Sequence, residues 1–175
     1  MKLIFPNLCY KEKAIKFIKE FYDYNSDING SGALERYLEE YSYEKWIEKI
    51  VSDIDVANIP QPRVPALTYF YIREEDDEIV GMINLRLSLN DFLKLEGGHI
   101  GYCIKPTERR KHYATDMLSK ALKVYEVLGI NEVIISCDKC NVTSANVIMN
   151  CNGELYSEFY SETFKEVIQK YIIKL

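Results

Sequence analysis

The hydrophobic periodicity of this chain changes at the proline-rich segment 56–66. Before this segment, residues 10–24 and 33–55 place apolar side chains three and four positions apart, which is the spacing of amphipathic helices. After it, residues 67–73 and 79–89 are rich in β-branched and aromatic residues, as strands are. The segment itself contains three prolines and cannot form regular structure. Helical and strand patterns in one chain predict an α/β protein.

The predicted order of elements is β-α-α-β-β-β-α-β-α-β-β, beginning with a strand at 2–5. The clearest helical pattern, 108–128, lies between strands at 99–105 and 132–138, and such a unit predicts a right-handed crossover between parallel strands. We therefore predict a single domain over residues 1–175, with a central mixed sheet and helices on both faces. A short helix and two strands close the chain, at 141–151, 154–160 and 167–175.

The composition fits a folded protein of the cytoplasm. Apolar residues make up 47% and charged residues 28% of the 175 residues, so we expect a buried core. No apolar run approaches the roughly 18 residues of a membrane span, and the N-terminus lacks a signal-peptide pattern. The net charge of −5 argues against a nucleic-acid binder, which would have a basic face. We therefore expect neither membrane nor nucleic acid as a partner.

Five cysteines are scattered along the chain, and this odd number suits a reducing compartment better than a disulfide framework. Cys137 and Cys140 form a C-x-x-C pair, which is half of a zinc site. Because no second pair of suitable spacing completes the site, we expect no metal. A zinc-dependent protein is an alternative that only this pair supports.

Three consecutive cations, Arg109, Arg110 and Lys111, stand where helix 108–128 is predicted to begin. A helix start already carries partial positive charge and unpaired N–H groups, so these cations cost stability unless an anion binds there. A strand that leads through a loop into a cationic helix start is a general design for binding phosphate. The alternative is a solvated basic helix end.

The residues around these cations resemble the GNAT superfamily of acetyl-CoA-dependent N-acetyltransferases. The superfamily signature, Arg/Gln-x-x-Gly-x-Gly/Ala at a helix start after the fourth strand, is similar to the frame from Arg109 to Ala114. The preceding GGHIGY, from Gly97 to Tyr102, resembles an uncharacterised bacterial branch. The stretch NVTSANVIMNCNGE is similar to the second CoA-side element of the superfamily. The resemblance covers about residues 67–160.

This resemblance implies acetyl-CoA as co-substrate and direct attack of an amine on its thioester. The pyrophosphate would lie on backbone N–H groups and the pantetheine arm along the fourth strand, with the thioester where the fourth and fifth strands splay apart. The CoA-binding residues that the resemblance implies are Cys103, Ile104, Arg109, Arg110, Lys111, His112, Tyr113, Ala114, Thr115, Asn141 and Ser144.

Two positions depart from the superfamily pattern. His112 stands where the signature has its central glycine, which permits close approach of the backbone to phosphate. We expect the imidazole either to weaken CoA binding or to add charge to the phosphate site at low pH. Ile148 stands where many members have a tyrosine that protonates the departing thiolate, so Tyr156 and Tyr160 are the alternative proton donors.

His99 and Glu96 are the candidate catalytic bases that precede the fourth strand. An imidazole with an ordinary pKa near 6.5 suits the deprotonation of an amine. The alternatives are a structural histidine that bonds to backbone after a glycine turn, and a solvated loop carboxylate.

Asn84 and Arg86 are candidate substrate-binding residues, because they place polar groups inside a sheet that we expect to be covered on both sides. They either pair internally or line the acceptor site, where Arg86 would recognise a carboxylate. The acidic residues of the second helical region, which begin with Glu35, form either a solvated face or a surface that attracts an amine.

We therefore predict an enzyme that transfers an acetyl group from acetyl-CoA to a primary amine of a small molecule or peptide. The alternative is a catalytically silent module that binds or senses acyl-CoA, which the departures at His112 and Ile148 support. By analogy with such folds, a homodimer is the default expectation.

Overall fold

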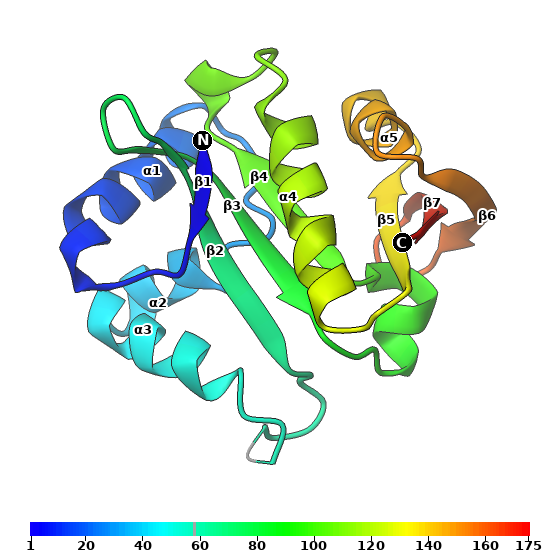
Figure 1. Cartoon of the computed structure of the whole chain (residues 1–175), viewed down its shortest axis with the longest axis horizontal. Coiled ribbons are helices and arrows are strands. Elements are labelled where there is room, and N and C mark those ends of the chain that lie inside the picture. The colour runs from blue at the N-terminus through cyan, green and yellow to red at the C-terminus, as the bar shows by residue number, and fades with distance from the viewer. Residues whose placement is uncertain (58) are drawn as a thin grey trace.

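The computed structural model describes residues 1–57 and 59–175 and arranges the strands in two sheets (Figure 1). The first sheet has the order β1 (Lys2–Ile4), β2 (Ala66–Arg73), β3 (Glu78–Arg86) and β4 (Ile100–Ile104), and each neighbouring pair is antiparallel. The second sheet, also antiparallel, has the order β5 (Glu132–Asp138), β7 (Glu166–Lys174) and β6 (Glu154–Ser161).

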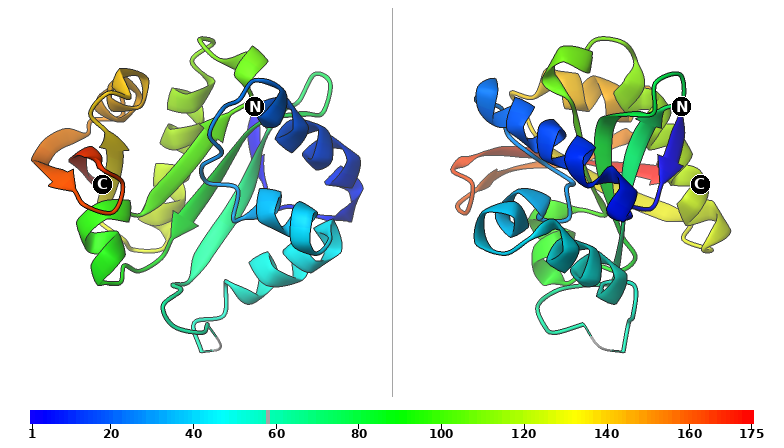
Figure 2. Two further views of the ribbon diagram at one scale, coloured as in Figure 1. Left: turned by 180° about the vertical axis from the view of Figure 1, so that it is seen from behind. Right: turned by 90° about the vertical axis from the view of Figure 1, so that its left-hand side faces the viewer.

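Helices cover both faces of the first sheet (Figures 1 and 2), which confirms the predicted fold class. One face carries the short 3-10 helix η1 (Leu8–Tyr10), α1 (Lys11–Asp23), α2 (Leu34–Glu40) and α3 (Tyr43–Ser52). The other face carries α4 (Tyr113–Val127), which follows the 3-10 turn η3 (Pro106–Glu108). A π-helical turn, η2 (Leu93–Gly97), precedes β4, and α5 (Val142–Met149) lies beside β5.

The helical region predicted over 33–55 consists of two helices, since α2 ends before Tyr41 and Ser42 caps the start of α3. Ser42 has an extended backbone conformation, with φ −156° and ψ 166°. Its hydroxyl accepts a hydrogen bond from Lys45 N at 3.3 Å, which is the N-cap interaction that serine favours. The remaining order of elements is as predicted.

The predicted single mixed sheet is instead divided between β4 and β5. The two strands run in the same direction (Figure 1), yet no ladder joins them in the described part of the chain. The residues just before β4 contact β5 through an isolated antiparallel bridge from Gly98 to Ile135 and a hydrogen bond from Ile134 N to His99 Nδ1. Further along β4, the Tyr102 hydroxyl lies 2.9 Å from Ser144 Oγ of α5.

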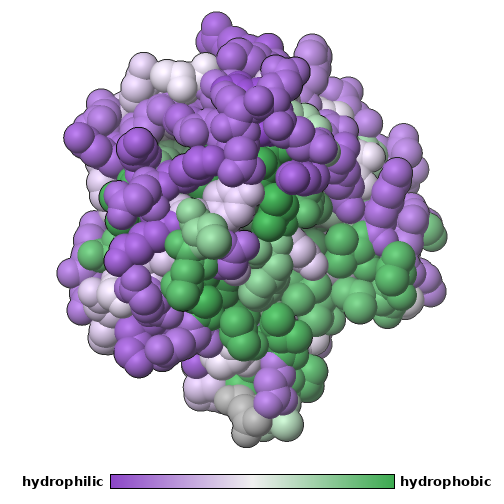
Figure 3. Space-filling view, turned by 60° about the vertical axis from the view of Figure 1, so that its left-hand side comes forward, coloured by the Kyte–Doolittle hydropathy of each residue, from purple (hydrophilic) through white to green (hydrophobic). Residues whose placement is uncertain are grey.

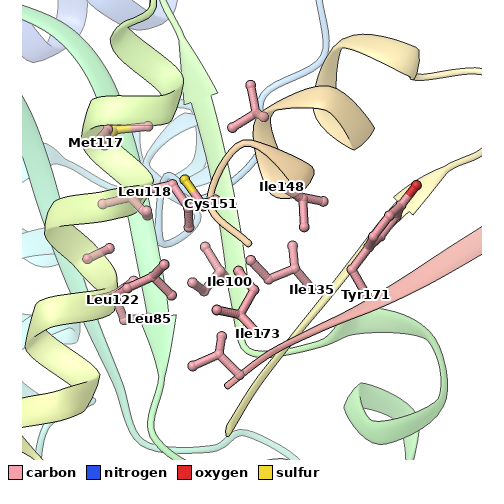
Figure 4. Packing of buried hydrophobic residues seen from close by; sticks show 14 of the residues in the cluster. Leu85, Ile100, Met117, Leu118, Leu122, Ile135, Ile148, Cys151, Tyr171 and Ile173 are labelled. Carbon is pink, nitrogen blue, oxygen red and sulfur yellow. The ribbon is translucent and has the colours of Figure 1, made fainter. Parts of the chain in front are cut away.

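Two hydrophobic clusters hold these layers together. The first lies between α4, α5 and both sheets, where Leu118 of α4, Ile100 of β4 and Ile135 of β5 gather (Figure 4). The second lies between the α1–α3 helices and the first sheet. It contains Trp46, which is fully buried and stacks on Phe70 with the ring centroids 5.7 Å apart. The first sheet is therefore covered by apolar side chains on both faces.

The surface over the α1–α3 layer is mostly polar, while apolar side chains gather over its lower part (Figure 3). Among the helices of the described residues, none combines the length and the apolar character needed to cross a bilayer.

Candidate functional site

The loop between β4 and α4 leaves a run of backbone N–H groups without protein acceptors. Within residues 1–57 and 59–175, no amide from Arg110 to Thr115 donates to a protein atom, and the first bond of α4 joins Asp116 N to His112 O at 3.2 Å. Arg110 and His112 have left-handed conformations, with φ 63° and 61°. Successive amides beside such residues form a concave nest for anions, and the helix dipole adds to it.

The helix predicted from 108 begins at Tyr113, so the three cations lie in the loop ahead of it. The prediction was wrong at this end because a left-handed residue such as His112 cannot continue a right-handed helix. The exposed His112 takes the backbone conformation that the glycine of the signature would take without cost.

The three cations have different partners. The Arg109 guanidinium donates to Ile104 O at 3.2 Å and to Ser26 Oγ at 2.6 Å, so it ties the loop to β4 and to the end of α1. Lys111 pairs with Glu108 at 2.8 Å. The exposed side chain of Arg110 has no hydrogen bond or ion pair with any described residue. It is therefore available to an anion above the nest.

A pair of hydroxyl groups lies in the gap between β4 and β5. The Tyr102 hydroxyl and Ser144 Oγ are 2.9 Å apart. Burial raises the pKa of Tyr102 to about 12, and the hydrogen bond to Ser144 opposes part of that rise. The side chain of Asn141 caps α5 by accepting from Ser144 N at 3.0 Å. Ile148, where many GNAT enzymes have a tyrosine, is fully buried in the first cluster.

A cavity of about 450 Å³ opens on the α1–α3 side of the first sheet. Its floor is formed by residues of β2 and β3, and its walls by the loop 28–33, the end of α3, the segment 62–64 and residues 90–93. The loop 28–33 crosses β4 so closely that a Cβ on Gly30 would lie 2.0 Å from Gly101 O. The cavity therefore lies against the strand along which the resemblance places pantetheine.

Asn84 and Arg86 have internal partners and also line this cavity. Asn84 Nδ2 donates to Thr68 Oγ1 at 3.0 Å. Arg86 Nη1 donates to the carbonyl oxygens of Gly97 and Gly98 at 3.1 and 2.9 Å. Both side chains therefore have internal partners, and their role in an acceptor site stays a prediction.

Two carboxylates also line the cavity. Asp53 is buried between Lys49 and Arg63, at 2.6 and 3.2 Å. Glu35, in the first turn of α2, is half-buried and accepts a hydrogen bond from the Ser31 hydroxyl. Burial raises the pKa of the Cys103 thiol of β4 to about 12, and the Glu35 carboxylate adds to the rise.

The predicted bases have partners elsewhere, and neither is among the described residues that line the cavity. His99 Nδ1 accepts from Ile134 N at 2.9 Å, while His99 N donates to Ile134 O at 2.6 Å. Burial lowers the pKa of His99, so the neutral imidazole joins β4 to β5. Glu96 accepts from Ser161 Oγ at 2.6 Å and from Thr163 Oγ1 at 3.1 Å, at the turn between β6 and β7.

The C-x-x-C pair does not form a cluster of ligands. Cys137 is buried and Cys140 is exposed, and the described residues include no group of three His, Cys, Asp or Glu side chains that could hold a metal ion. Tyr156 and Tyr160, the alternative proton donors, are both exposed on β6.

The family model for the acetyltransferase (GNAT) domain matches residues 20–154. The chain belongs to the GNAT family of acetyltransferases. The matched region includes the loop before α4, the gap between β4 and β5, and most of the cavity. No curated protein sequence matches the chain.

Solved GNAT structures share the fold over nearly the whole chain. The microcin self-immunity acetyltransferase MccE, in complex with acetyl-CoA and AMP, has a TM-score of 0.73 at 17% identity over 99% of this chain and 91% of MccE. RimL, an alpha-N-acetyltransferase of a ribosomal protein, in complex with coenzyme A, has a TM-score of 0.70 at 14% identity over 99% and 93% of the two chains. A spermidine N-acetyltransferase SpeG variant from Vibrio cholerae has a TM-score of 0.64 at 11% identity over 99% and 95%.

Two features of this GNAT acetyltransferase escaped the sequence analysis. Tyr102 was read only as part of the GGHIGY strand, although alternation along the strand places it on the same face as Ile100 and Ile104. Glu35 was one of many acidic residues on a helical surface, and only the fold brings it to the cavity. Neither position has a local signal that separates it from its neighbours.

Proposed function

We propose that this acetyltransferase moves the acetyl group of acetyl-CoA to a primary amine, which belongs to a small molecule or a peptide. The observation that carries the proposal is the run of unpaired amides from Arg110 to Thr115, with the exposed Arg110 side chain beside it. This array suits the pyrophosphate of CoA, because N–H groups at a helix start bind phosphate oxygens.

In this proposal the pantetheine arm follows β4 from the nest toward the cavity. Backbone groups of Cys103 and Ile104 would pair with the arm, and Asn141 at the start of α5 would donate to it from its exposed carboxamide. The edge of β4 that faces β5 has no ladder in the described part of the chain, so its N–H and C=O groups can bind an extended ligand.

The amine would enter through the cavity under loop 28–33. Glu35 is the carboxylate there that has no basic side chain as partner in the described residues, so we propose that it attracts the ammonium and accepts its proton. His99 and Glu96 are the bases proposed from sequence, and their bonds to Ile134 N and Ser161 Oγ favour structural roles instead.

The neutral nitrogen would then attack the carbonyl carbon of the thioester, and the C–S bond would break to release CoA thiolate. The acylated nitrogen would lose its second proton, which passes through solvent to replace the proton given to the thiolate. The hydroxyl pair of Tyr102 and Ser144 is the nearest proton source that the gap offers, and we propose that it protonates the thiolate. Because Ile148 is buried and has no hydroxyl, this pair replaces the tyrosine found at that position in many GNAT enzymes.

The test is turnover with acetyl-CoA and a panel of primary amines, followed by release of CoA thiol and by mass spectrometry of the acetylated product. We expect turnover with at least one amine class. Tyr102→Phe should lower kcat by about 10- to 100-fold while the Kd for acetyl-CoA stays within about twofold, and Ser144→Ala should lower kcat by a similar factor. Unchanged kcat in both variants rejects the proton donor.

The second candidate function is a silent acyl-CoA-binding module, which the buried Ile148 at the tyrosine position favours. The same assay separates the two functions. A silent module would bind acetyl-CoA and would release no thiol with any amine of the panel.

A further inference from the structure

Arg86 is a cation inside the cavity that has no acidic partner. Its two hydrogen bonds both leave Nη1 and end on backbone carbonyls, those of Gly97 and Gly98. Nη2 and Nε donate to no described residue. Among the described residues, Ser136 Oγ is the only fully buried side-chain nitrogen or oxygen that has no hydrogen-bond partner. Since Nη2 and Nε of Arg86 also have no partner, they are not fully buried. Arg86 lines the cavity, so we infer that these two nitrogens are accessible to a ligand there.

The other cations of the cavity are neutralised. Lys49 and Arg63 both contact the Asp53 carboxylate, at 2.6 and 3.2 Å. No carboxylate of a described residue forms an ion pair with Arg86. Burial lowers the pKa of Arg86, but a guanidinium remains charged at neutral pH. A half-buried charge without a counter-ion is costly unless a ligand supplies one.

Arg86, at the end of β3, lies beside β4, along which the pantetheine arm is proposed to bind. A Cβ on Gly101 would lie 3.8 Å from Arg86 Nη2, so the guanidinium faces β4 at Gly101. Glu35 lines the same cavity from the first turn of α2. The cavity therefore contains both a carboxylate and a guanidinium, which one bifunctional molecule can contact together.

We infer that the amine acceptor carries an oxyanion, a carboxylate or a phosphate, which the free edge of the Arg86 guanidinium binds while the amine faces Glu35. This inference rests on the proposed acetyl transfer, because it names the acceptor class of that site. A guanidinium presents two parallel N–H groups, and this geometry matches both kinds of oxyanion. Amino acids, acidic peptides and amino phosphates belong to the class, and simple polyamines do not.

Binding is the first test, since it does not depend on turnover. Protein saturated with CoA is titrated by calorimetry with matched amines: glycine against glycinamide, β-alanine against its amide, and O-phosphoethanolamine against ethanolamine. We expect the anionic member of at least one pair to bind at least tenfold more tightly, about the effect of one charge-assisted hydrogen bond. The carboxylate and phosphate arms identify which oxyanion the cavity prefers. Absence of any preference overturns the inference.

Variants of two cavity cations give the matched comparison. Arg86→Gln keeps an N–H donor for the glycine carbonyls and removes the charge, so it should abolish the preference, whereas Arg86→Lys should keep part of it. Arg63→Gln removes a cation that Asp53 already neutralises and should keep the preference. A CoA-induced rise in Tm in each variant shows that it is folded. Loss of preference in Arg63→Gln with retention in Arg86→Gln would contradict the assignment.

Turnover separates this inference from the proposed function. A binding preference without acetylation of any amine would reject the transferase and leave the anion site in place. Acetylation of neutral and anionic amines at equal kcat/KM would support the transferase and reject the anion site.

Discussion

His112 adopts a left-handed backbone conformation, φ 61°, at the residue immediately before α4. This conformation costs a non-glycine residue roughly 1 kcal/mol, and the structure offers no hydrogen bond from the imidazole to a described residue in return. The backbone geometry of the loop before α4 is thus maintained at the expense of stability.

His112→Gly should increase the free energy of unfolding by roughly 1 kcal/mol and preserve or tighten acetyl-CoA binding, because glycine adopts the same φ without strain. Urea denaturation and calorimetry measure the two effects. His112→Ala is the matched control, since it removes the imidazole and keeps the strained φ; its stability should stay near that of the wild type. A loss of acetyl-CoA affinity above about tenfold in both variants would mean that the imidazole itself binds phosphate.

His99 predicts a pH dependence of stability. Burial lowers its pKa in the folded protein below the ordinary value of about 6.5, and protonation would break the bond from Ile134 N. Below pH about 6.5 the unfolded chain therefore binds this proton more readily than the folded protein. The contribution of neutral His99 to the free energy of unfolding is therefore complete above pH about 6.5, and it is lost as the pH falls toward the pKa of His99 in the folded protein.

Urea midpoints measured between pH 7.5 and 5 should decrease for the wild type more steeply than for His99→Asn, which cannot titrate. Equal slopes for the two proteins would show that the His99 pKa is the same in the folded and unfolded states.

At the scale of elements, the loop 28–33 is held against β4 by a contact between backbones. Gly30 has φ 72° and leaves no space for a Cβ, because Gly101 O would lie 2.0 Å from it. The loop leads into α2, whose first turn contains Glu35. The geometry of the cavity thus depends on one glycine.

Gly30→Ala should push the loop from β4, lower the free energy of unfolding by about 2 kcal/mol or more, and raise the KM for the amine while the CoA-induced Tm shift remains. Gly129→Ala is the control: Gly129 also has a positive φ, 74°, but nothing lies within 4 Å of its Cβ position. It should cost only about 1 kcal/mol and leave KM unchanged. Equal effects of the two substitutions would show that the contact between Gly30 and β4 does not position the loop.

Periodicity predicted the helices and strands, but it did not predict where α4 begins or that the sheet divides between β4 and β5. The apolar stripe of helix 108–128 begins only at Ala114, so periodicity did not specify how far the helix extends before it, and the observed start at Tyr113 depends on a left-handed residue. The division of the sheet between β4 and β5 has no counterpart in the local pattern, and the Tyr102–Ser144 hydrogen bond joins residues that lie far apart in sequence. Contacts of that kind have no local signature.

At the scale of the whole molecule, the two halves of the site lie on different faces of the same sheet system. The nest and the hydroxyl pair belong to the side of α4 and α5, and the cavity belongs to the side of α1–α3. The cationic motif at Arg109 predicted the first half because its residues are consecutive. The second half collects Glu35, Asn84 and Arg86 from distant segments, and only the tertiary fold shows that the first of these belongs to it.

The central claim is that the amides from Arg110 to Thr115 hold the pyrophosphate of CoA. Calorimetric titration with acetyl-CoA and with S-acetylpantetheine, which lacks the pyrophosphate, tests it most directly. We predict that acetyl-CoA binds at least about 100-fold more tightly and that its affinity decreases with salt. Equal affinities for the two thioesters, or no binding of acetyl-CoA at millimolar concentration, would contradict the claim.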